Sequence, residues 1–290
     1  MIVTQLLGGI GNQFFQYAIG RALACKHCVP LRLDTAPFKH YHLRTYALEH
    51  FAIEGEILSD TERNKLGLNR LPRGRVVRAV HKLFGRSSIP VIHEEKFEFD
   101  ASILDAPPSC YLQGYWQSPK YFATIEPHIR QELTCRHALT GRNAEFAARI
   151  ASCQAVSLHL RRGDYVTSAR TSQYHGTCGP DYYTTAEALL RERVGALELF
   201  VFSDDPDWAE ANLHFPSPAI YLRHNGPERD YEDLRLMTLC KHHIIANSTF
   251  SWWGAWLCQN PGKLVIAPRN WFKEANHSTA DLIPDSWIRL

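Results

Sequence analysis

The chain has 290 residues, and its 45% hydrophobic content is enough to fill the core of one large α/β domain or of two domains of ordinary size. Its 32 basic and 30 acidic residues give a formal net charge of +2, which excludes a strongly cationic nucleic-acid-binding protein. The N-terminus does not read as a secretory leader, and no apolar run approaches the roughly 18 residues of a membrane span, so we expect a cytoplasmic protein.

The first 35 residues predict a strand, a tight turn, a helix and a second strand. Residues 2–6 are β-prone and end in the glycine turn 8–11. Apolar residues then recur with the spacing of one helix face through His27, and residues 29–35 again alternate as a strand. The helix contains Cys25 and Cys28, which have the spacing of half a zinc site, but no second pair completes a ligand set. We therefore expect the eight cysteines to be reduced and mostly structural.

The middle of the chain is less regular and carries a basic segment. From Arg63 to His93 there is no Asp or Glu, whereas eight Lys and Arg residues fall within 63–86. Two interpretations stay open: weak contact with an acidic membrane surface, peripheral at the inner membrane, or with an anionic glycolipid, and a solvated face. Residues 109–122 predict a strand, a loop and a helix. The loop is rich in aromatic residues, which could stack on a sugar or close a seam between domains.

The C-terminal half alternates regularly between short apolar strands and helices, as expected of a parallel sheet buried on both faces. We predict a doubly wound α/β domain over 151–290 and a separate domain over 1–150. Strands are expected at 155–160, 197–203, 219–222, 243–246 and 264–267, and helices at 181–193, 207–212, 230–240 and 250–258.

Ligands of open parallel sheets bind beyond the carboxyl ends of the strands, and polar clusters follow three of the predicted strands. Arg161 and Arg162 follow the strand 155–160, where guanidinium groups can form bidentate bonds to a phosphate, together with Asp164. The alternative is an ion pair that fixes a turn. Ser203 and Asp204 follow the next strand, where a carboxylate could accept hydrogen bonds from a ribose or a base, or cap a helix.

The third cluster lies at a predicted strand-to-helix turn, where free backbone N–H groups and the helix dipole favour an anion. Its hydroxyl groups belong to Ser248, Thr249 and Ser251. A fourth cluster, at the N-terminal glycine turn, contains Gly9 and Asn12 but lacks the dinucleotide and Walker patterns. Together the four clusters predict a ligand with a diphosphate, held by the C-terminal domain and covered by the first loop of the N-terminal domain.

Five blocks of sequence resemble, in their order, the bacterial α-1,2-fucosyltransferases of glycosyltransferase family 11. They are "GGIGNQFFQYAIGRALA", "GYWQSPKYF", "HLRRGDYV", "FSDD" and "LCKHHIIANSTFSWWGAWL". The resemblance extends over nearly the whole chain and is weakest over 55–105. It implies a GT-B architecture of two facing Rossmann-like domains. It also implies that GDP-β-L-fucose is bound mainly by the C-terminal domain and that the acceptor is approached from the N-terminal one.

The same resemblance implies roles for individual residues. Arg161 would contact the β-phosphate, and Asp164 and His159 are catalytic candidates, although no general base is identified. The expected donor-binding residues are Gly9, Asn12, Arg161, Arg162, Ser203, Asp204, Ser248, Thr249, Phe250 and Ser251. The expected acceptor-binding residues are Tyr115, Trp116 and Gln117. No cofactor and no metal are expected, since a guanidinium and a helix N-terminus can supply the positive charge.

The implied activity is an inverting transfer of L-fucose to the 2-hydroxyl group of a terminal galactose in an oligosaccharide. One alternative is a fucosyltransferase of another linkage, α-1,6 or peptide-O, because these enzymes share the HxRR element. The other alternative, from a different class, is a carbohydrate-binding module without catalysis.

Overall fold

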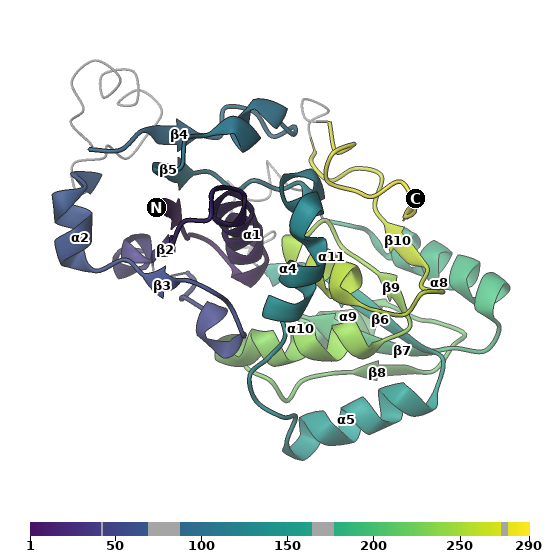
Figure 1. The fold of residues 1–290 in the computed structure, drawn as a ribbon. Coiled ribbons are helices and arrows are strands. Elements are labelled where there is room, and N and C mark those ends of the chain that lie inside the picture. Colours follow the sequence, from purple (N-terminus) through teal and green to yellow (C-terminus); the bar gives the residue numbers. More distant parts are fainter. Residues whose placement is uncertain (42, 69–87, 164–176, 274–277) are drawn as a thin grey trace. The chain divides into compact units, whose positions relative to one another are not determined.

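The computed structural model describes residues 1–290 except 42, 69–87, 164–176 and 274–277 (Figure 1). The chain divides into two compact units, the N-terminal unit Met1–Thr134 and the C-terminal unit Cys135–Leu290. We expected the division near residue 150, but this position falls inside a helix, α5 (Gly141–Ser152). Ile150 of this helix is buried in a core of the C-terminal unit, so the division lies before the helix and not at its end.

The N-terminal unit is built on a five-stranded sheet with the order β3-β2-β1-β5-β4, and every pairing is parallel. The strands are β1 Ile2–Gln5, β2 Leu31–Asp34, β3 Glu56–Ile57, β4 Val91–His93 and β5 Cys110–Gln113. The helices are α1 Ile10–His27, α2 Asp60–Lys65 and α4 Glu126–Glu132, and the 3-10 helices are η1 Ala36–Lys39, η2 Leu48–His50, η4 Ala101–Asp105 and η5 Pro119–Ile125. The predicted β-α-β start is therefore confirmed.

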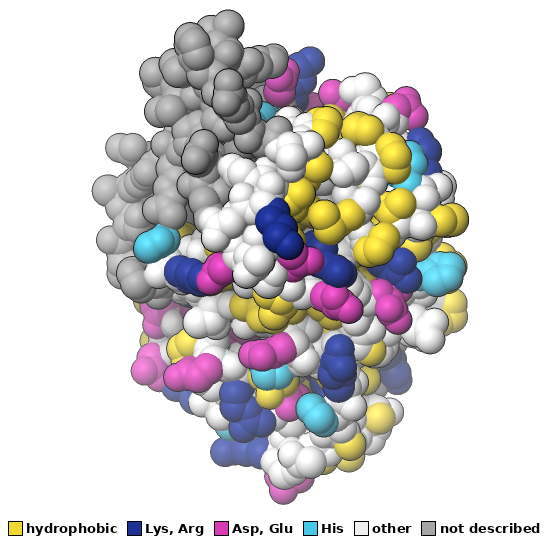
Figure 2. Space-filling view, turned by 60° about the vertical axis from the view of Figure 1, so that its left-hand side comes forward, with side chains coloured by type: hydrophobic (Ala, Val, Ile, Leu, Met, Phe, Trp, Pro, Cys, Tyr) yellow, Lys and Arg dark blue, Asp and Glu magenta, His cyan; other side chains and the backbone are white. Residues whose placement is uncertain are grey.

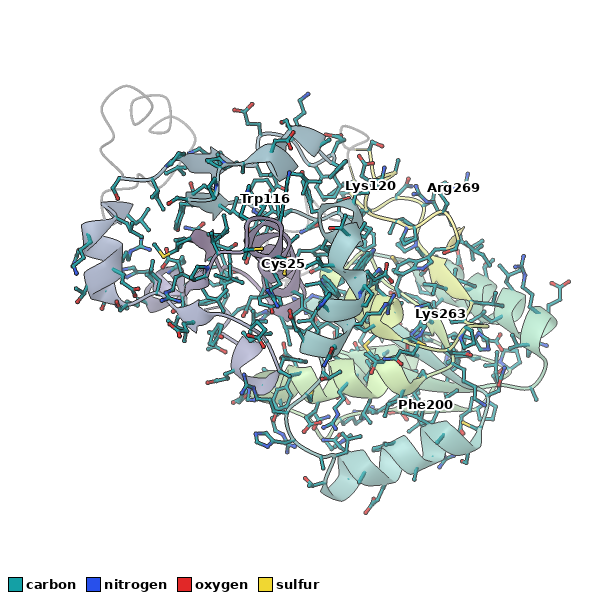
Figure 3. All side chains as sticks on the ribbon, in the orientation of Figure 1. Cys25, Trp116, Lys120, Phe200, Lys263 and Arg269 are labelled. Carbon is teal, nitrogen blue, oxygen red and sulfur yellow. The ribbon has the colours of Figure 1, made fainter. Side chains whose placement is uncertain are left out.

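Helix α1 packs closely on this sheet because a glycine faces the strands. A Cβ atom on Gly20 would lie 3.0 Å from Leu31 and 3.1 Å from Thr4. The Thr4 hydroxyl donates to the backbone oxygen of Gln16, 3.0 Å away, and so joins β1 to the helix. Cys25 lies in the last turn of α1 (Figure 3), and Cys28 is the residue that follows the helix; both are free thiols.

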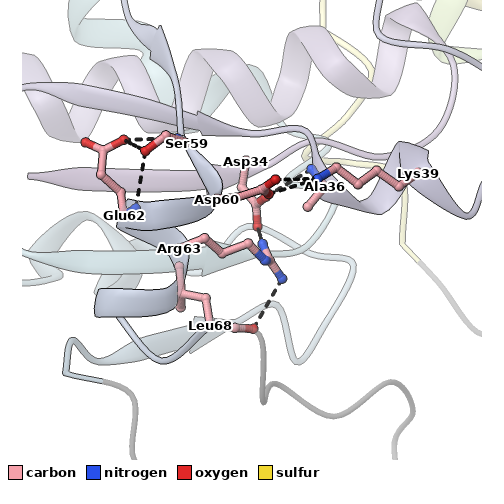
Figure 4. A network of polar contacts seen from close by, with 8 residues as sticks. All are labelled: Asp34, Ala36, Lys39, Ser59, Asp60, Glu62, Arg63 and Leu68. Carbon is pink, nitrogen blue, oxygen red and sulfur yellow. Dashed lines mark hydrogen bonds and ion pairs between the residues drawn. The ribbon is translucent and has the colours of Figure 1, made fainter.

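The first residue of the basic segment is part of a buried ion pair. Arg63 of α2 pairs with Asp34 at the end of β2, and its guanidinium also donates to the backbone oxygen of Leu68 at 3.2 Å (Figure 4). Asp34 accepts a further hydrogen bond from the Tyr111 hydroxyl at 2.7 Å. Arg63 therefore stabilises the fold and is not available to a membrane surface. Most of the remaining segment lies outside the described residues.

Two further observations bear on membrane contact. On the face shown in Figure 2, described Lys and Arg side chains are interspersed with Asp and Glu side chains and form no patch of one sign. Within the described part of the chain, none of the helices combines the length and the hydropathy needed to span a bilayer.

The C-terminal unit contains a six-stranded parallel sheet with the order β11-β10-β9-β6-β7-β8. Its strands are β6 Ala155–Leu160, β7 Glu198–Ser203, β8 Ala219–Tyr221, β9 His242–Ile244, β10 Val265–Ala267 and β11 Ile288–Arg289. Besides α5, its helices are α8 Pro180–Val194, α9 Pro206–Asn212, α10 Asp230–Leu239 and α11 Thr249–Leu257, with the 3-10 helix η6 Pro227–Arg229. Every strand and helix predicted for this half is present.

Helices cover both faces of the C-terminal sheet. Successive side chains of a strand point to opposite faces, so Leu199 and Val201 of β7 pack in a core with α8 and α9. Phe200 (Figure 3) and Phe202 pack in a second core with α5 and α10. The predicted doubly wound arrangement is confirmed, and it explains why these strands are nearly all apolar.

Candidate functional site

The three polar clusters predicted for the C-terminal half lie at the carboxyl ends of neighbouring strands. Strand β6 pairs with β7 on one side and with β9 on the other. The chain runs outward from β6 through β7 to β8 and then returns to the other side of β6 to form β9. The boundary between β6 and β9 is thus a topological switch point, where open α/β sheets hold their ligands. Two segments flank this point: the one that begins at Arg161, after β6, and the one that begins at Asn247, after β9.

Arg161 is held in place by the carboxylate of Asp204. The Arg161 Nη1 atom lies 3.0 Å from Asp204 Oδ2, and Asp204 Oδ1 accepts a hydrogen bond from the backbone N–H of Arg162 at 2.9 Å. The side chains of Arg161 and Asp204 are 18% and 25% exposed, so the pair is partly buried and still reaches solvent. A Cβ atom on Gly163 would be 2.9 Å from Asp204 Oδ2, so a larger residue at this position would displace the carboxylate. Asp204 orients the guanidinium that we expected to bind phosphate.

Arg162 is directed toward helix α9. Its guanidinium carbon lies 4.0 Å from the centroid of the Trp208 ring, and its Nε atom lies 3.4 Å from Asp205. Asp205 also accepts a hydrogen bond from the Trp208 backbone N–H at 3.3 Å and so caps α9. The Ser203 hydroxyl accepts from the backbone N–H of Asp205 at 2.9 Å. These contacts favour the interpretation of Arg162 and Ser203 as residues that fix the turns.

His159 lies in the interior below Arg161. It is 4% exposed, and its ring centroid is 5.2 Å from that of Phe250 on α11. Among the described residues, Nδ1 of His159 has no hydrogen-bond partner. The pKa of His159 is lowered to about 3, mainly by burial; the nearby Asp204 opposes this shift and Arg161 adds to it. The imidazole is therefore neutral at physiological pH.

The turn between β9 and α11 places hydroxyl and N–H groups beside the end of β6. Ser248 is the residue before the helix, and its side chain does not cap α11, in which Thr249 is the first residue. Ser251 is fully buried and donates to the backbone oxygens of Ser248 and Ala246, so its hydroxyl fixes the turn. Asn247 was not singled out from the sequence; its amide donates to the backbone oxygen of Trp271 at 3.1 Å and anchors the same turn.

The N-terminal unit has an equivalent switch point between β1 and β5. The chain runs from β1 to β2 and β3 on one side and returns to the other side as β4 and β5. Gly8 after β1 has a φ of +87°, and Gly9 precedes α1. The Gln117 amide, in the loop after β5, donates to the side-chain oxygen of Asn12 on α1 at 3.0 Å. Asn12 and Gln117, predicted separately as donor and acceptor ligands, are therefore neighbours.

The aromatic loop after β5, Gly114–Gln117, differs from expectation at one residue. Tyr115 is 42% exposed, as an acceptor-binding side chain would be. Trp116, by contrast, is fully buried against Tyr121, with ring centroids 5.8 Å apart. We expected Trp116 to contact the acceptor. This expectation is wrong, because the indole is buried in the interior, where it anchors the loop. The aromatic composition alone could not distinguish an exposed ring from a buried one.

Two glutamines of the predicted first helix were missed from the sequence although they shape this edge. Gln13 is buried; its amide donates to the backbone oxygen of Gly8 at 3.0 Å, and its side-chain oxygen accepts from Ala47. Gln16 is also buried and joins the loops after β1 and β5, since it accepts from the Leu7 N–H and donates to the Gly114 oxygen. The signal that could have identified them from the sequence was the occurrence of two polar residues on the apolar face of a helix.

Asp164, the remaining predicted catalytic residue, lies outside the described residues. Among the described residues, no group of three or more metal-binding side chains is found.

Comparison with known proteins identifies the family. The model of "Glycosyl transferase family 11" matches residues 94–290. The chain is 32% identical to an Escherichia coli alpha-1,2-colitosyltransferase, over all of this chain and 99% of that protein. It is also 32% identical to the Escherichia coli O-antigen biosynthesis glycosyltransferase WbnK, over 98% of this chain and 99% of that protein. A galactoside alpha-(1,2)-fucosyltransferase 1 from Aotus azarae is 27% identical over 57% of this chain and 47% of its own length.

Solved structures show the fold. The complex of Arabidopsis thaliana FUT1 with GDP aligns with a TM-score of 0.57 at 10% identity, over 92% of this chain and 70% of that one. POFUT1 in complex with GDP aligns with a TM-score of 0.51 at 16% identity, over 92% and 97% of the two chains. The GT-B class expected from the sequence is confirmed. With the family match over most of its length, the chain belongs to glycosyltransferase family 11 and is similar to α-1,2-linking fucosyl- and colitosyltransferases.

Proposed function

We propose that this protein transfers L-fucose from GDP-β-L-fucose to the 2-hydroxyl group of a terminal galactose in an oligosaccharide, with inversion at the fucose anomeric carbon. The observation that carries the proposal is Arg161, held by Asp204 at the switch point of the C-terminal sheet. The relatives that share its full length are glycosyltransferases, and one is α-1,2-linking by name.

The C-terminal unit supplies the groups that a sugar diphosphate requires. In the transfer, the bond from the fucose anomeric carbon to the phosphate oxygen breaks, and negative charge develops on the departing GDP. A guanidinium fixed before the reaction stabilises that charge without having to reorganise. Arg161 takes this role, and the N-terminus of α11, at Thr249, provides N–H groups and a positive dipole end on the neighbouring strand.

The acceptor oxygen forms the new bond from the face opposite to the departing phosphate, and its proton passes to a base. His159 is neutral, but it is buried, and its lowered pKa makes it a weak base. We therefore propose that His159 supports the nucleotide site through its contact with Phe250. Asp164 remains the candidate base by its place in the motif.

We propose that the reaction needs no metal ion. The charge on the departing diphosphate is met by Arg161 and the helix N-terminus, and Asp204, the acidic residue that a metal site would use, is already paired with Arg161. Transfer that continues in EDTA is the expected result, and loss of transfer restored by Mg²⁺ or Mn²⁺ would contradict it.

A second donor deserves a direct comparison because one full-length relative is a colitosyltransferase by name. Colitose is L-fucose without the 3-hydroxyl group. The two donors therefore differ only in a hydrogen bond to that hydroxyl, and a site built to accept it discriminates strongly against its absence.

Two measurements test the proposal. GDP is expected to raise the Tm, whereas NAD and free glycans are not, which separates an enzyme from a carbohydrate-binding module. Transfer to a β-galactoside acceptor is then measured with GDP-L-fucose and with GDP-colitose. A higher kcat/KM with GDP-fucose supports the proposal. A higher kcat/KM with GDP-colitose would identify GDP-colitose as the donor and leave the linkage to be determined.

A further inference from the structure

The loop Gly114–Gln117 has a backbone conformation that its own residues do not favour. Trp116 has a φ of +58°, a left-handed conformation that is rare and costly for a bulky residue. Such a conformation persists only where the surrounding structure determines it. Gly114 has no space for a side chain, since a Cβ atom there would lie 2.4 Å from the Cβ atom of Glu94.

Glu94 provides the contacts that hold this conformation. It follows β4, the neighbour of β5, and its backbone N–H donates to the Gln113 oxygen at 3.1 Å. Its two carboxylate oxygens each accept one backbone N–H of the loop: Oε2 accepts from Tyr115 and Oε1 accepts from Trp116, both at 2.7 Å. The loop is therefore fixed by two short bonds to one charged group, which are stronger than bonds between neutral groups.

The loop presents its functional side chains at the edge of the sheet where ligands are held. Trp116 points inward and is fully buried, whereas Tyr115 is 42% exposed. Gln117 touches Asn12 across the switch point between β1 and β5. An exposed ring on a fixed backbone is the usual means of stacking on the apolar face of a sugar, because little conformational freedom is lost on binding.

We propose that Glu94 is a positioning residue for the acceptor: its carboxylate fixes the Tyr115–Trp116 backbone so that Tyr115 and Gln117 bind the terminal galactose. This inference rests on the proposed function. Glu94 does not touch the acceptor itself. Its contribution is to prepare the loop before the acceptor arrives, so its loss raises the acceptor KM and leaves the donor site in the C-terminal unit unaltered.

The test compares Glu94→Gln with Glu95→Gln. A glutamine has one acceptor oxygen and one donor NH₂, so it can keep only one of the two hydrogen bonds to the loop. Its NH₂ group then faces the other backbone N–H, and two donors cannot form a hydrogen bond. Glu95 is the adjacent exposed carboxylate and undergoes the same chemical change. A third variant, Tyr115→Ala, removes the exposed ring without removing a core side chain and remains informative if Glu94→Gln does not fold.

Wild-type transfer to a β-galactoside is measured first, because its absence would contradict the proposed function itself. We then expect the acceptor KM to rise about tenfold in Glu94→Gln and in Tyr115→Ala, with the donor KM and the affinity for GDP unchanged and with wild-type values in Glu95→Gln. An unchanged acceptor KM in folded Glu94→Gln, or in Tyr115→Ala, would overturn the assignment. An equal rise in the donor KM would also overturn it, since that result indicates a general structural role.

Discussion

Replacing Arg161 by alanine removes the charge that we assign to the β-phosphate. Loss of one fixed donor to a developing oxyanion costs about 2.7–4 kcal/mol, so kcat/KM should fall about 10²- to 10³-fold. The free energy of unfolding should fall by about 1–3 kcal/mol, because the pair is partly buried and the substitution leaves the Asp204 carboxylate without its partner.

The matched control is Arg149→Ala. Arg149 also lies in the C-terminal unit and pairs with one carboxylate, Glu198, but it is 56% exposed, and Glu198 is at the amino end of β7, opposite to the carboxyl end where Arg161 and Asp204 lie. Initial rates with GDP-fucose and a β-galactoside, together with thermal unfolding, are measured for both variants. Wild-type rates are expected for Arg149→Ala. If folded Arg161→Ala kept more than about a tenth of the wild-type kcat/KM, the phosphate role would be refuted.

Three further predictions concern stability. Trp253 is fully buried between Trp252 and Trp256, so Trp253→Ala should lower the free energy of unfolding by about 3–5 kcal/mol in urea denaturation. Glu132→Gln should cost about 2–4 kcal/mol by the same measurement, because the buried carboxylate pairs with Arg21 at 2.8 Å and accepts from a buried tyrosine hydroxyl. Burial holds the pKa of His243 well below its usual value, so unfolding takes up a proton below about pH 6.5 and stability falls as the pH falls. His243→Asn should make that decline less steep, measured by denaturation between pH 6 and 5.

Each of these predictions has an opposite outcome that would contradict its reasoning. Normal stability with lost activity in Trp253→Ala would mean that this indole acts in the site. A wild-type free energy of unfolding in Glu132→Gln would show that the buried ion pair contributes nothing. An unchanged pH slope in His243→Asn would show that this histidine is not held neutral in the fold.

The C-terminal half was predictable because the burial of its strands on both faces underlies both the apolar sequence pattern and the fold. Strands buried on both faces are mostly apolar, so β6 was predicted with the bounds Ala155–Leu160 that the structure has. The positions of Arg161, Ser203 and Ser248 followed, since the carboxyl ends of parallel strands meet at one edge of a sheet. Their partners did not follow, because the pairing of Arg161 with Asp204 and of Arg162 with Trp208 depends on side-chain directions after the strands end.

The N-terminal half was less predictable because its short elements depend on contacts distant in sequence. β4 has only three residues, all partly buried, and lies in a basic stretch whose composition suggested a solvated face. Glu94 gave no local signal, since its role comes from a loop some twenty residues later. Helix α2 could have been found, however, because Ser59 and Glu62 form the capping box that the spacing S-x-x-E encodes.

The linkage of the product tests the proposed activity most directly. The protein is incubated with isotopically labelled GDP-L-fucose and a galactose-terminated oligosaccharide, and the product is analysed by heteronuclear NMR. We predict a single α-linked fucose whose anomeric proton correlates with carbon 2 of the terminal galactose. Fucose attached through any other position, or in a β linkage, would contradict the proposed function.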